Sequence, residues 1–227
     1  MDPGLRRAWT QIVTCEDYEE HMASIGQAQA GADLTRQIIQ SAHPPAGSRV
    51  VIAGAGAGQA LDFLDAAVLR PYTLTFTDLN PVFLARLEKR LAERALAATI
   101  LEDDIEHSAI EPGPDLLIAA LLLEHIDWRR GVDAIAKLRP AACGIVIQEN
   151  PAGMATAVTP GRAIPPSIAK AVEIGLPTLV AREDLVAALA MRGFACQHTW
   201  VREVADRKKL VALLFHRQPF PGATGRQ

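Results

Sequence analysis

A glycine-rich turn stands where an apolar, β-branched run ends. The segment VVIAGAGAGQAL, residues 50–61, holds Gly54, Ala55, Gly56 and Gly58 in close succession. Glycine lets the chain turn tightly and lets a ligand lie against bare backbone at the carboxyl end of a strand. A strict dinucleotide-binding pattern needs Gly or Ala at position 59, where this chain has Gln59. The turn therefore predicts a ligand site that fits dinucleotides poorly, although some glycine-rich turns only close a connection.

Carboxylates follow the glycine turn at the ends of the next two predicted strands. Asp78 ends the segment YTLTFTD, and a carboxylate there can accept hydrogen bonds from both hydroxyls of a ribose. Asp103 and Asp104 end the third strand, where one of them can accept from an adenine amino group while Ile105 packs on the ring. Each acid alone can also be a solvated turn residue. Three strand ends in chain order favour a nucleoside site.

The elements that must position these groups alternate between apolar strands and amphipathic helices. We predict seven strands, in SRVVIA, YTLTFTD, ATILEDD, DLLIAA, CGIVIQEN, ACQHTWVREV and KKLVALLFHR. Helices are predicted over residues 16–41, 59–69, 128–139 and 182–194, and another begins at Asn80-Pro81. Helical crossovers imply parallel neighbours, whereas the tight turn at Asp206-Arg207 implies antiparallel ones. The prediction is an α/β fold, a doubly wound, mostly parallel sheet of seven strands with an antiparallel last strand.

The predicted domain boundaries follow from this alternation. Residues 1–45 are expected to form a helical N-terminal cap, 46–217 the α/β domain and 218–227 a flexible tail. The Pro- and Gly-rich segment 151–166 is long for a connection, and it predicts a lid or substrate-pocket insert, or else a plain surface loop. A chain that starts at about Ala42 is then expected to fold and to bind its ligand more weakly.

These segments together resemble class I S-adenosylmethionine-dependent methyltransferases, over about residues 48–217. VVIAGAGAG is similar to the glycine motif of that family, TFTDLNPVFL to its ribose-binding motif and LEDDIEH to its adenine-contacting segment. PDLLIAALLLEHIDW resembles the fourth-strand motif, and LRPAACGIVIQE the segment that leads into the fifth strand. The family has a Rossmann-like sheet whose seventh strand is antiparallel, as predicted above.

The resemblance implies a cofactor, a reaction and a binding site. The cofactor is S-adenosylmethionine, and the reaction is methyl transfer to a small-molecule N or O acceptor. The implied cofactor contacts are Gly54, Ala55, Gly56, Gly58, Asp78, Leu79, Asp103, Asp104, Ile105 and Ala120. The family usually carries an acid where this chain has Ile52. Backbone carbonyls around Gly54 or a residue of the N-terminal helix are then expected to hold the ammonium group of the cofactor.

Three side chains are candidates for contact with the acceptor. His125 follows the fourth strand and can deprotonate an amine or hydroxyl at neutral pH, or simply make a local hydrogen bond. Glu149 ends the fifth strand and can orient an acceptor, or be a solvated acid. Tyr18 lies in an N-terminal helix that either folds over the cofactor or packs on the sheet edge.

Composition excludes several other classes of function. The chain has 227 residues, with 23 Lys and Arg against 26 Asp and Glu, and this net charge of −3 favours neither nucleic acid nor an anionic membrane. The longest apolar run, Leu116 to Leu123, is too short to cross a bilayer. The three cysteines are widely spaced and the six histidines are scattered, so no metal site is predicted. The few, widely spaced cysteines also favour a reducing cytoplasm. A homodimer is an open expectation.

Two other functions compete with methyl transfer. The glycine-rich turn and Asp78 also suit an NAD(P)-dependent oxidoreductase, which Gln59 and the antiparallel last strand oppose. Ile52 raises the second alternative, a non-catalytic S-adenosylmethionine-binding relative. Calorimetry with S-adenosylhomocysteine, NAD and NADP separates these hypotheses.

Overall fold

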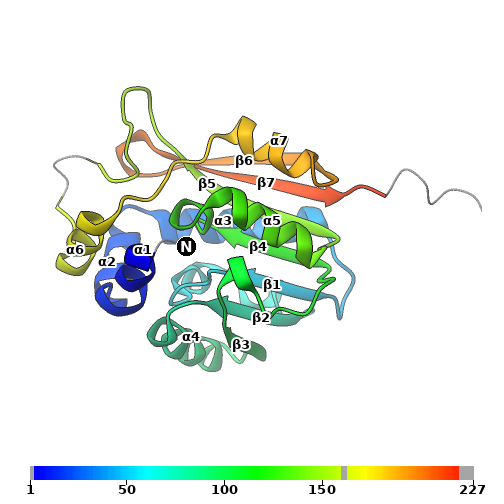
Figure 1. Cartoon of the computed structure of the whole chain (residues 1–227). Coiled ribbons are helices and arrows are strands. Elements are labelled where there is room, and N and C mark those ends of the chain that lie inside the picture. The colour runs from blue at the N-terminus through cyan, green and yellow to red at the C-terminus, as the bar shows by residue number, and fades with distance from the viewer. Residues whose placement is uncertain (1–2, 160–162, 220–227) are drawn as a thin grey trace, which may run out of the picture.

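A seven-stranded sheet forms the centre of the molecule (Figure 1). The structure, a computed structural model, describes residues 3–159 and 163–219. The strand order is β3-β2-β1-β4-β5-β7-β6. The strands are β1 (Arg49–Ala53), β2 (Thr73–Asp78), β3 (Ala98–Glu102), β4 (Leu116–Ala120), β5 (Ala142–Glu149), β6 (Phe194–Glu203) and β7 (Lys209–Arg217). β1 to β5 pair in parallel, and β7 runs antiparallel to β5 and β6. The predicted doubly wound sheet with an antiparallel last strand is confirmed.

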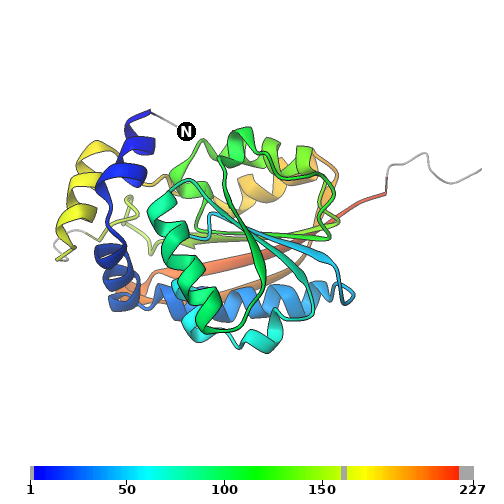
Figure 2. The same ribbon diagram turned by 90° about the horizontal axis from the view of Figure 1, so that it is seen from below.

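Helices cover both faces of the sheet, as Figure 2 shows. On one face lie α3 (Gln27–Ala42) and α4 (Pro81–Glu93), whose buried residues Leu34, Ile38 and Leu87 join one hydrophobic cluster with β1, β4 and β7. On the other face, α5 (Trp128–Leu138) and α7 (Arg182–Ala190) share a second cluster with the opposite sides of the same strands. The central strands are buried on both faces, as their unbroken apolar sequence predicts.

Helix α4 begins at the residues that the sequence indicates. The Asn80 side chain accepts hydrogen bonds from the backbone N–H of Val82 (2.9 Å) and of Phe83 (3.4 Å), and Pro81 occupies the first helical position. Because Asn80 begins α4 directly after β2, Asp78 lies at the edge of the sheet.

Two predicted helices differ in the structure. The helix predicted over residues 16–41 is divided into α2 (Cys15–Ser24) and α3, because Gly26 between them has a φ of 73°. The segment 59–69 forms two short 3-10 turns, η2 (Gln59–Phe63) and η3 (Ala66–Val68). The side chain of Asp65 accepts from the backbone N–H of Ala67 at 2.9 Å, so a new turn begins in the middle of the predicted helix.

Helix α3 packs directly on the sheet, although the predicted N-terminal helical segment extends to residue 45. A Cβ on Gly144 of β5 would lie 2.4 Å from the Ile38 side chain, so this helix rests directly on the backbone of the sheet. The part that stands outside the two helical layers is residues 3–24, with α1 (Pro3–Arg7), η1 (Ala8–Ile12) and α2. We call these residues the N-terminal cap.

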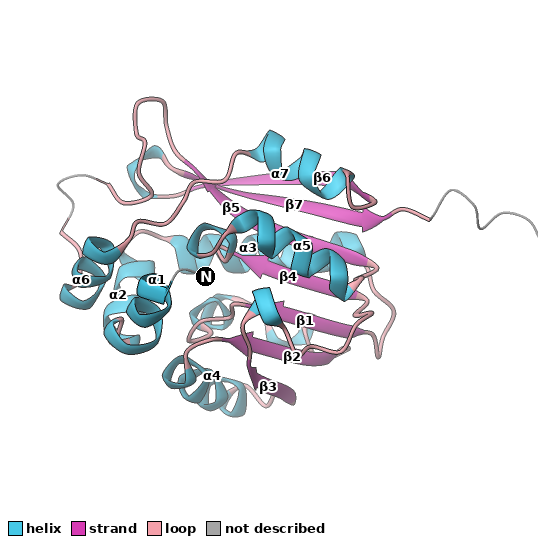
Figure 3. Cartoon of the chain, viewed as in Figure 1, coloured by secondary structure: helices cyan, strands magenta, loops and turns pink. Residues whose placement is uncertain are grey.

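The N-terminal cap lies beside α6 (Pro166–Ile174) at the end of the sheet to which β4 points (Figures 1 and 3). The backbone N–H of Thr14 donates to Ser167 Oγ (3.1 Å), and the Ser167 N–H donates to Asp17 Oδ2 (2.7 Å). A third hydrophobic cluster joins the N-terminal cap, α6, the glycine turn and α4, with members Ala8, Val13, Cys15, Ala57, Phe83, Ile168 and Ala171. Helix α6 was not predicted.

Three short 3-10 helices follow strands of the sheet: η4 (Ile105–His107) after β3, η5 (Leu123–His125) after β4 and η6 (Ala205–Arg207) after β6. Residues 160–162 of the predicted lid, and 220–227 of the predicted tail, lie outside the described residues. No described helix combines the length and apolarity needed to span a bilayer.

Candidate functional site

Two cavities lie side by side at the carboxyl ends of the parallel strands. One, which we call the loop crevice, is lined by the glycine turn, Asp78, the loop after β3 and the end of β4. The other, which we call the cap cavity, is lined by residues of the N-terminal cap, of α6 and of the segments that follow β4 and β5. Four residues line both cavities and form the wall between them: Trp9, Tyr18, Leu121 and His125.

The glycine turn needs its glycines for two reasons. Gly54, Gly56 and Gly58 all have positive φ, of 65°, 58° and 75°. A Cβ on Gly54 would lie 2.7 Å from Leu122, and one on Gly58 would lie 2.5 Å from Leu87. Gly54 and Gly56 line the loop crevice. Ala55 and Gly58 do not, so Gly58 serves the packing of α4.

Asp78 stands at the centre of the loop crevice. Its Oδ2 accepts from the backbone N–H of Gly56 (2.8 Å), and its Oδ1 accepts from that of Asn80 (2.9 Å). Burial raises the pKa of Asp78, and these backbone donors oppose that shift. Because a carboxylate has about four acceptor positions, Asp78 keeps capacity for a ligand hydroxyl beside these backbone donors. Leu79 and Ala120 line the same crevice.

The two acids after β3 have local partners. Asp103 is buried, and its carboxylate accepts from Ser108 Oγ (2.8 Å) and from the Ala109 N–H (2.7 Å), which holds the loop. Asp104 accepts from the Glu106 N–H and forms an ion pair with Arg6 of the N-terminal cap. Both line the loop crevice beside the buried Ile105. An adenine amino group bound as the sequence predicts would have to share Asp104 with Arg6.

Aromatic rings of the N-terminal cap cover the glycine turn. Tyr18 stacks on Phe83 with ring centroids 5.2 Å apart, and the edge of Trp9 meets Tyr18 at 5.7 Å. A Cβ on Gly56 would lie 3.3 Å from Tyr18 Cε1. Burial raises the pKa of Tyr18 to about 12, so its hydroxyl stays protonated at neutral pH. The structure thus brings Tyr18 to the site, whereas Trp9 has no signal in the sequence.

The chain leaves β4 through a strained residue. Leu121 has a φ of 55°, in a region that costs a non-glycine residue roughly 1–2 kcal/mol. Its N–H donates to Val146 O at 2.9 Å, which extends the pairing with β5. Strained residues gather at functional sites. Leu121 lies in the wall between the two cavities.

Two ionisable side chains follow Leu121. His125 contacts Trp9 edge-on with ring centroids 4.5 Å apart, and burial lowers the pKa of His125 to about 4. Glu124 is 3% exposed, and its Oε1 accepts from the Gln148 N–H at 2.7 Å. Burial raises the pKa of Glu124 to about 7. The sequence singled out His125 and missed Glu124, although both follow an apolar strand.

Glu149 is not brought to either cavity. Arg182 Nε and Nη2 donate to its two carboxylate oxygens at 2.8 and 2.9 Å, so Glu149 anchors the beginning of α7. The preceding residue, Gln148, lines the cap cavity in its place. Within residues 3–159 and 163–219, no group of three or more His, Cys, Asp or Glu side chains is placed to hold a metal.

Comparisons with known proteins support the fold. Neither the protein-family models nor the curated proteins contain a match. Among solved structures, magnesium protoporphyrin IX methyltransferase of Synechocystis PCC 6803 with bound S-adenosylmethionine is 14% identical, with a TM-score of 0.63 over 84% of this chain and 79% of that one. The N-methyltransferase NodS of Bradyrhizobium japonicum, solved with S-adenosylhomocysteine, is 16% identical, with a TM-score of 0.60 over 85% and 88%.

A protein named as a cyclase, SpnF, is equally similar. It is 16% identical, with a TM-score of 0.63 over 84% of this chain and 82% of that one. The chain therefore has the fold of class I S-adenosylmethionine-dependent methyltransferases, as the sequence resemblance implies. Because one fold can serve different reactions, the residues of the site determine the activity.

Proposed function

We propose that the chain is an S-adenosylmethionine-dependent methyltransferase that acts on a small-molecule N or O acceptor. The observation that carries this proposal is the pair of cavities with a shared wall. The loop crevice lies where the strand order reverses between β1 and β4, which is where open α/β sheets bind ligands. The cap cavity gives a second molecule a place directly beside it.

The residues of the loop crevice fit the proposed cofactor. The Asp78 carboxylate keeps acceptor capacity for the ribose, and Ile105 offers an apolar wall to the adenine. Gly54 and Gly56 present bare backbone to the methionine part. Ile52 packs in the hydrophobic cluster under the sheet and supplies no charge for the ammonium group. Backbone carbonyls of the turn then take that role.

The protein mainly has to position two molecules and exclude water. The cofactor supplies a methyl group on a positively charged sulfur, so no protein nucleophile is needed. The Tyr18 ring lies against Gly56 of the glycine turn, and the Trp9 ring packs on Tyr18, so both rings reduce the access of water to the site. Holding both reactants in one geometry lowers the entropic part of the barrier.

Isothermal titration calorimetry with three ligands tests the proposal. S-adenosylhomocysteine is expected to bind with one site per chain, whereas NAD and NADP are expected to give no heat of binding. The reason is that Gln59 does not suit the helix packing of a dinucleotide site. Binding of NAD or NADP in preference to S-adenosylhomocysteine would instead support an oxidoreductase.

The glycine turn gives a prediction with a matched control. Gly56→Ala and Gly113→Ala both place a side chain at positive φ, 58° and 80°, and each is expected to lose roughly 1–2 kcal/mol of unfolding free energy. A Cβ at position 113 meets no atom within 4 Å, whereas one at 56 points into the loop crevice against Tyr18. Only Gly56→Ala is therefore expected to lose S-adenosylhomocysteine affinity, by about tenfold or more. Equal affinities in the two variants would make the turn purely structural.

A further inference from the structure

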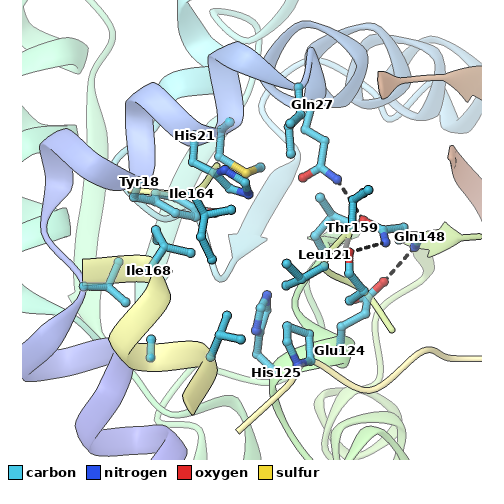
Figure 4. A pocket seen from close by; sticks show the side chains of 18 of the residues that line it. Tyr18, His21, Gln27, Leu121, Glu124, His125, Gln148, Thr159, Ile164 and Ile168 are labelled. Carbon is cyan, nitrogen blue, oxygen red and sulfur yellow. Dashed lines mark hydrogen bonds between the residues drawn. The ribbon is translucent and has the colours of Figure 1, made fainter. Parts of the chain in front are cut away.

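The cap cavity is a partly open, mainly apolar space (Figure 4). Its volume of about 110 Å³ is several times the ~10–15 Å³ that one water molecule needs. Apolar and aromatic side chains dominate its lining, among them Trp9, Met22, Ile164, Ile168 and Val172. A molecule that fills this space must therefore be mostly apolar.

Most polar groups around the cap cavity bind one another. Gln27 Nε2 donates to Gln148 Oε1 at 2.9 Å, and Gln148 Nε2 donates in turn to Asn150 Oδ1 (2.8 Å) and Ala157 O (3.1 Å). Lys208 Nζ donates to Ala157 O at 2.6 Å. Thr159 Oγ1 donates to Asp206 Oδ2 at 2.6 Å. These groups hold the wall of the cavity together.

Glu124 and His125 each keep a polar atom for a ligand. In the part of the chain that the structure describes, Glu124 Oε2 and His125 Nδ1 are buried and have no hydrogen-bond partner. Both side chains lie on the cavity wall in Figure 4. A buried polar atom without a partner is costly, so a ligand that binds it gains that free energy.

The charges around the cap cavity disfavour an anionic ligand. Lys208 and Asp206 carry opposite charges, and Glu124 adds either no charge or a negative one. A carboxylate or phosphate placed beside ionised Glu124 would be repelled. A neutral hydroxyl can instead donate a hydrogen bond to Glu124 Oε2.

We propose that the acceptor is a neutral, mostly apolar molecule with a phenolic hydroxyl, and that Glu124 is the general base that removes its proton. This inference rests on the proposed methyl transfer. His125, on the wall shared with the loop crevice, orients the same oxygen. His125 was the base suggested by the sequence, and Glu124 replaces it in that role.

Proton affinities agree with this division of roles. With a pKa of about 7, Glu124 is partly ionised at neutral pH. A phenol has a pKa of about 10, so a base of this strength can take its proton as the methyl group is transferred. An aliphatic hydroxyl, with an acidity near that of water at about 15.7, is too weak an acid. The pKa of about 4 keeps His125 neutral, as a hydrogen-bonding group.

The step balances in protons and electrons. The phenolic proton moves to Glu124 Oε2 as the oxygen forms a bond to the methyl carbon. The bond between that carbon and sulfur breaks, and its electron pair stays on sulfur, which becomes neutral. Glu124 then releases the proton to solvent when the product leaves.

Two isosteric variants test the role of Glu124. Glu124→Gln keeps a side-chain oxygen for the Gln148 N–H but cannot take a proton. Glu149→Gln makes the same change at a carboxylate that lines neither cavity, and it serves as the control. The probes are 2-naphthol and 2-naphthoate, which share a ring system and differ in charge.

Binding is measured first, without cofactor, by calorimetry. The wild type and Glu149→Gln are expected to bind 2-naphthol at least about tenfold more tightly than 2-naphthoate, because the naphthoate meets a like charge. Glu124→Gln is expected to reduce that preference. A wild type that binds no 2-naphthol, or a Glu124→Gln variant with unchanged preference, would overturn the inference.

Turnover gives an independent readout. With S-adenosylmethionine and 2-naphthol, kcat/KM of the wild type is expected to fall as the pH drops below about 7, since the protonated carboxyl is no base. Glu124→Gln is expected to lose about 10²- to 10⁴-fold in kcat and to lose that pH dependence. The other ionisable groups that line the cavity are His21, Tyr18, His125, Asp206 and Lys208. A dependence retained in Glu124→Gln would assign it to one of them.

S-adenosylhomocysteine affinity separates this inference from the proposed function. If the wild type binds S-adenosylhomocysteine but prefers 2-naphthoate, only the acceptor and the base are contradicted. If it binds no S-adenosylhomocysteine, the methyltransferase proposal itself fails.

Discussion

A chain that lacks residues 1–41 is expected not to fold, whereas one that lacks residues 1–24 is expected to fold and to bind S-adenosylhomocysteine at least about tenfold more weakly. The longer deletion removes α3, with the buried Leu34, Ile38 and Ile39. Burial of each is worth roughly 1.5–3 kcal/mol, and together they approach a whole domain's stability of about 5–15 kcal/mol.

The shorter deletion tests the N-terminal cap alone. It removes Tyr18, which lies against Gly56 of the glycine turn, and Trp9, which packs on Tyr18, and it leaves both hydrophobic clusters of the sheet intact. Circular dichroism during urea unfolding measures the fold, and calorimetry measures the affinity. A folded chain without residues 1–41, or full affinity without residues 1–24, would contradict these roles.

Asp78→Ala is expected to weaken S-adenosylhomocysteine binding by roughly 1.5–3 kcal/mol, about 10- to 150-fold. The substitution removes the acceptor for the ribose hydroxyls, which would then be buried without a partner. It also removes the acceptor for the Gly56 and Asn80 N–H groups, so unfolding free energy is measured in parallel.

Asp104→Ala is the comparison for this prediction. It also removes a carboxylate from the loop crevice, but that carboxylate already binds Arg6 and the Glu106 N–H. Its effect on affinity is expected to be smaller. Equal losses in the two variants would remove the ribose assignment from Asp78.

The parts of the fold predicted from sequence are those that local patterns determine. Apolar runs such as residues 116–120 are strands buried on both faces, and Asn80-Pro81 begins a helix, because neither depends on distant partners. Gly54 and Gly56 line the loop crevice because the turn that holds them follows the carboxyl end of β1, and ligand sites of open α/β sheets lie at that edge.

The structure differs from the sequence-based expectations where distant residues determine the outcome. Residues 27–42 read as a helical extension, but contacts with β5, about a hundred residues later, make α3 part of the core. Glu149 was chosen as a strand-end acid, and Arg182 binds it. Glu124 was missed because the burial that raises its pKa depends on tertiary packing, which its neighbours in the sequence do not indicate.

The most direct test of the proposed site is a crystal structure of the chain with S-adenosylhomocysteine. The ribose is expected to bind the Asp78 carboxylate in the loop crevice, with the adenine beside Ile105. The sulfur is expected to face the wall formed by Leu121 and His125, toward the cap cavity. S-adenosylhomocysteine bound outside the loop crevice, or with its sulfur turned away from the cap cavity, would contradict the arrangement of cofactor and acceptor.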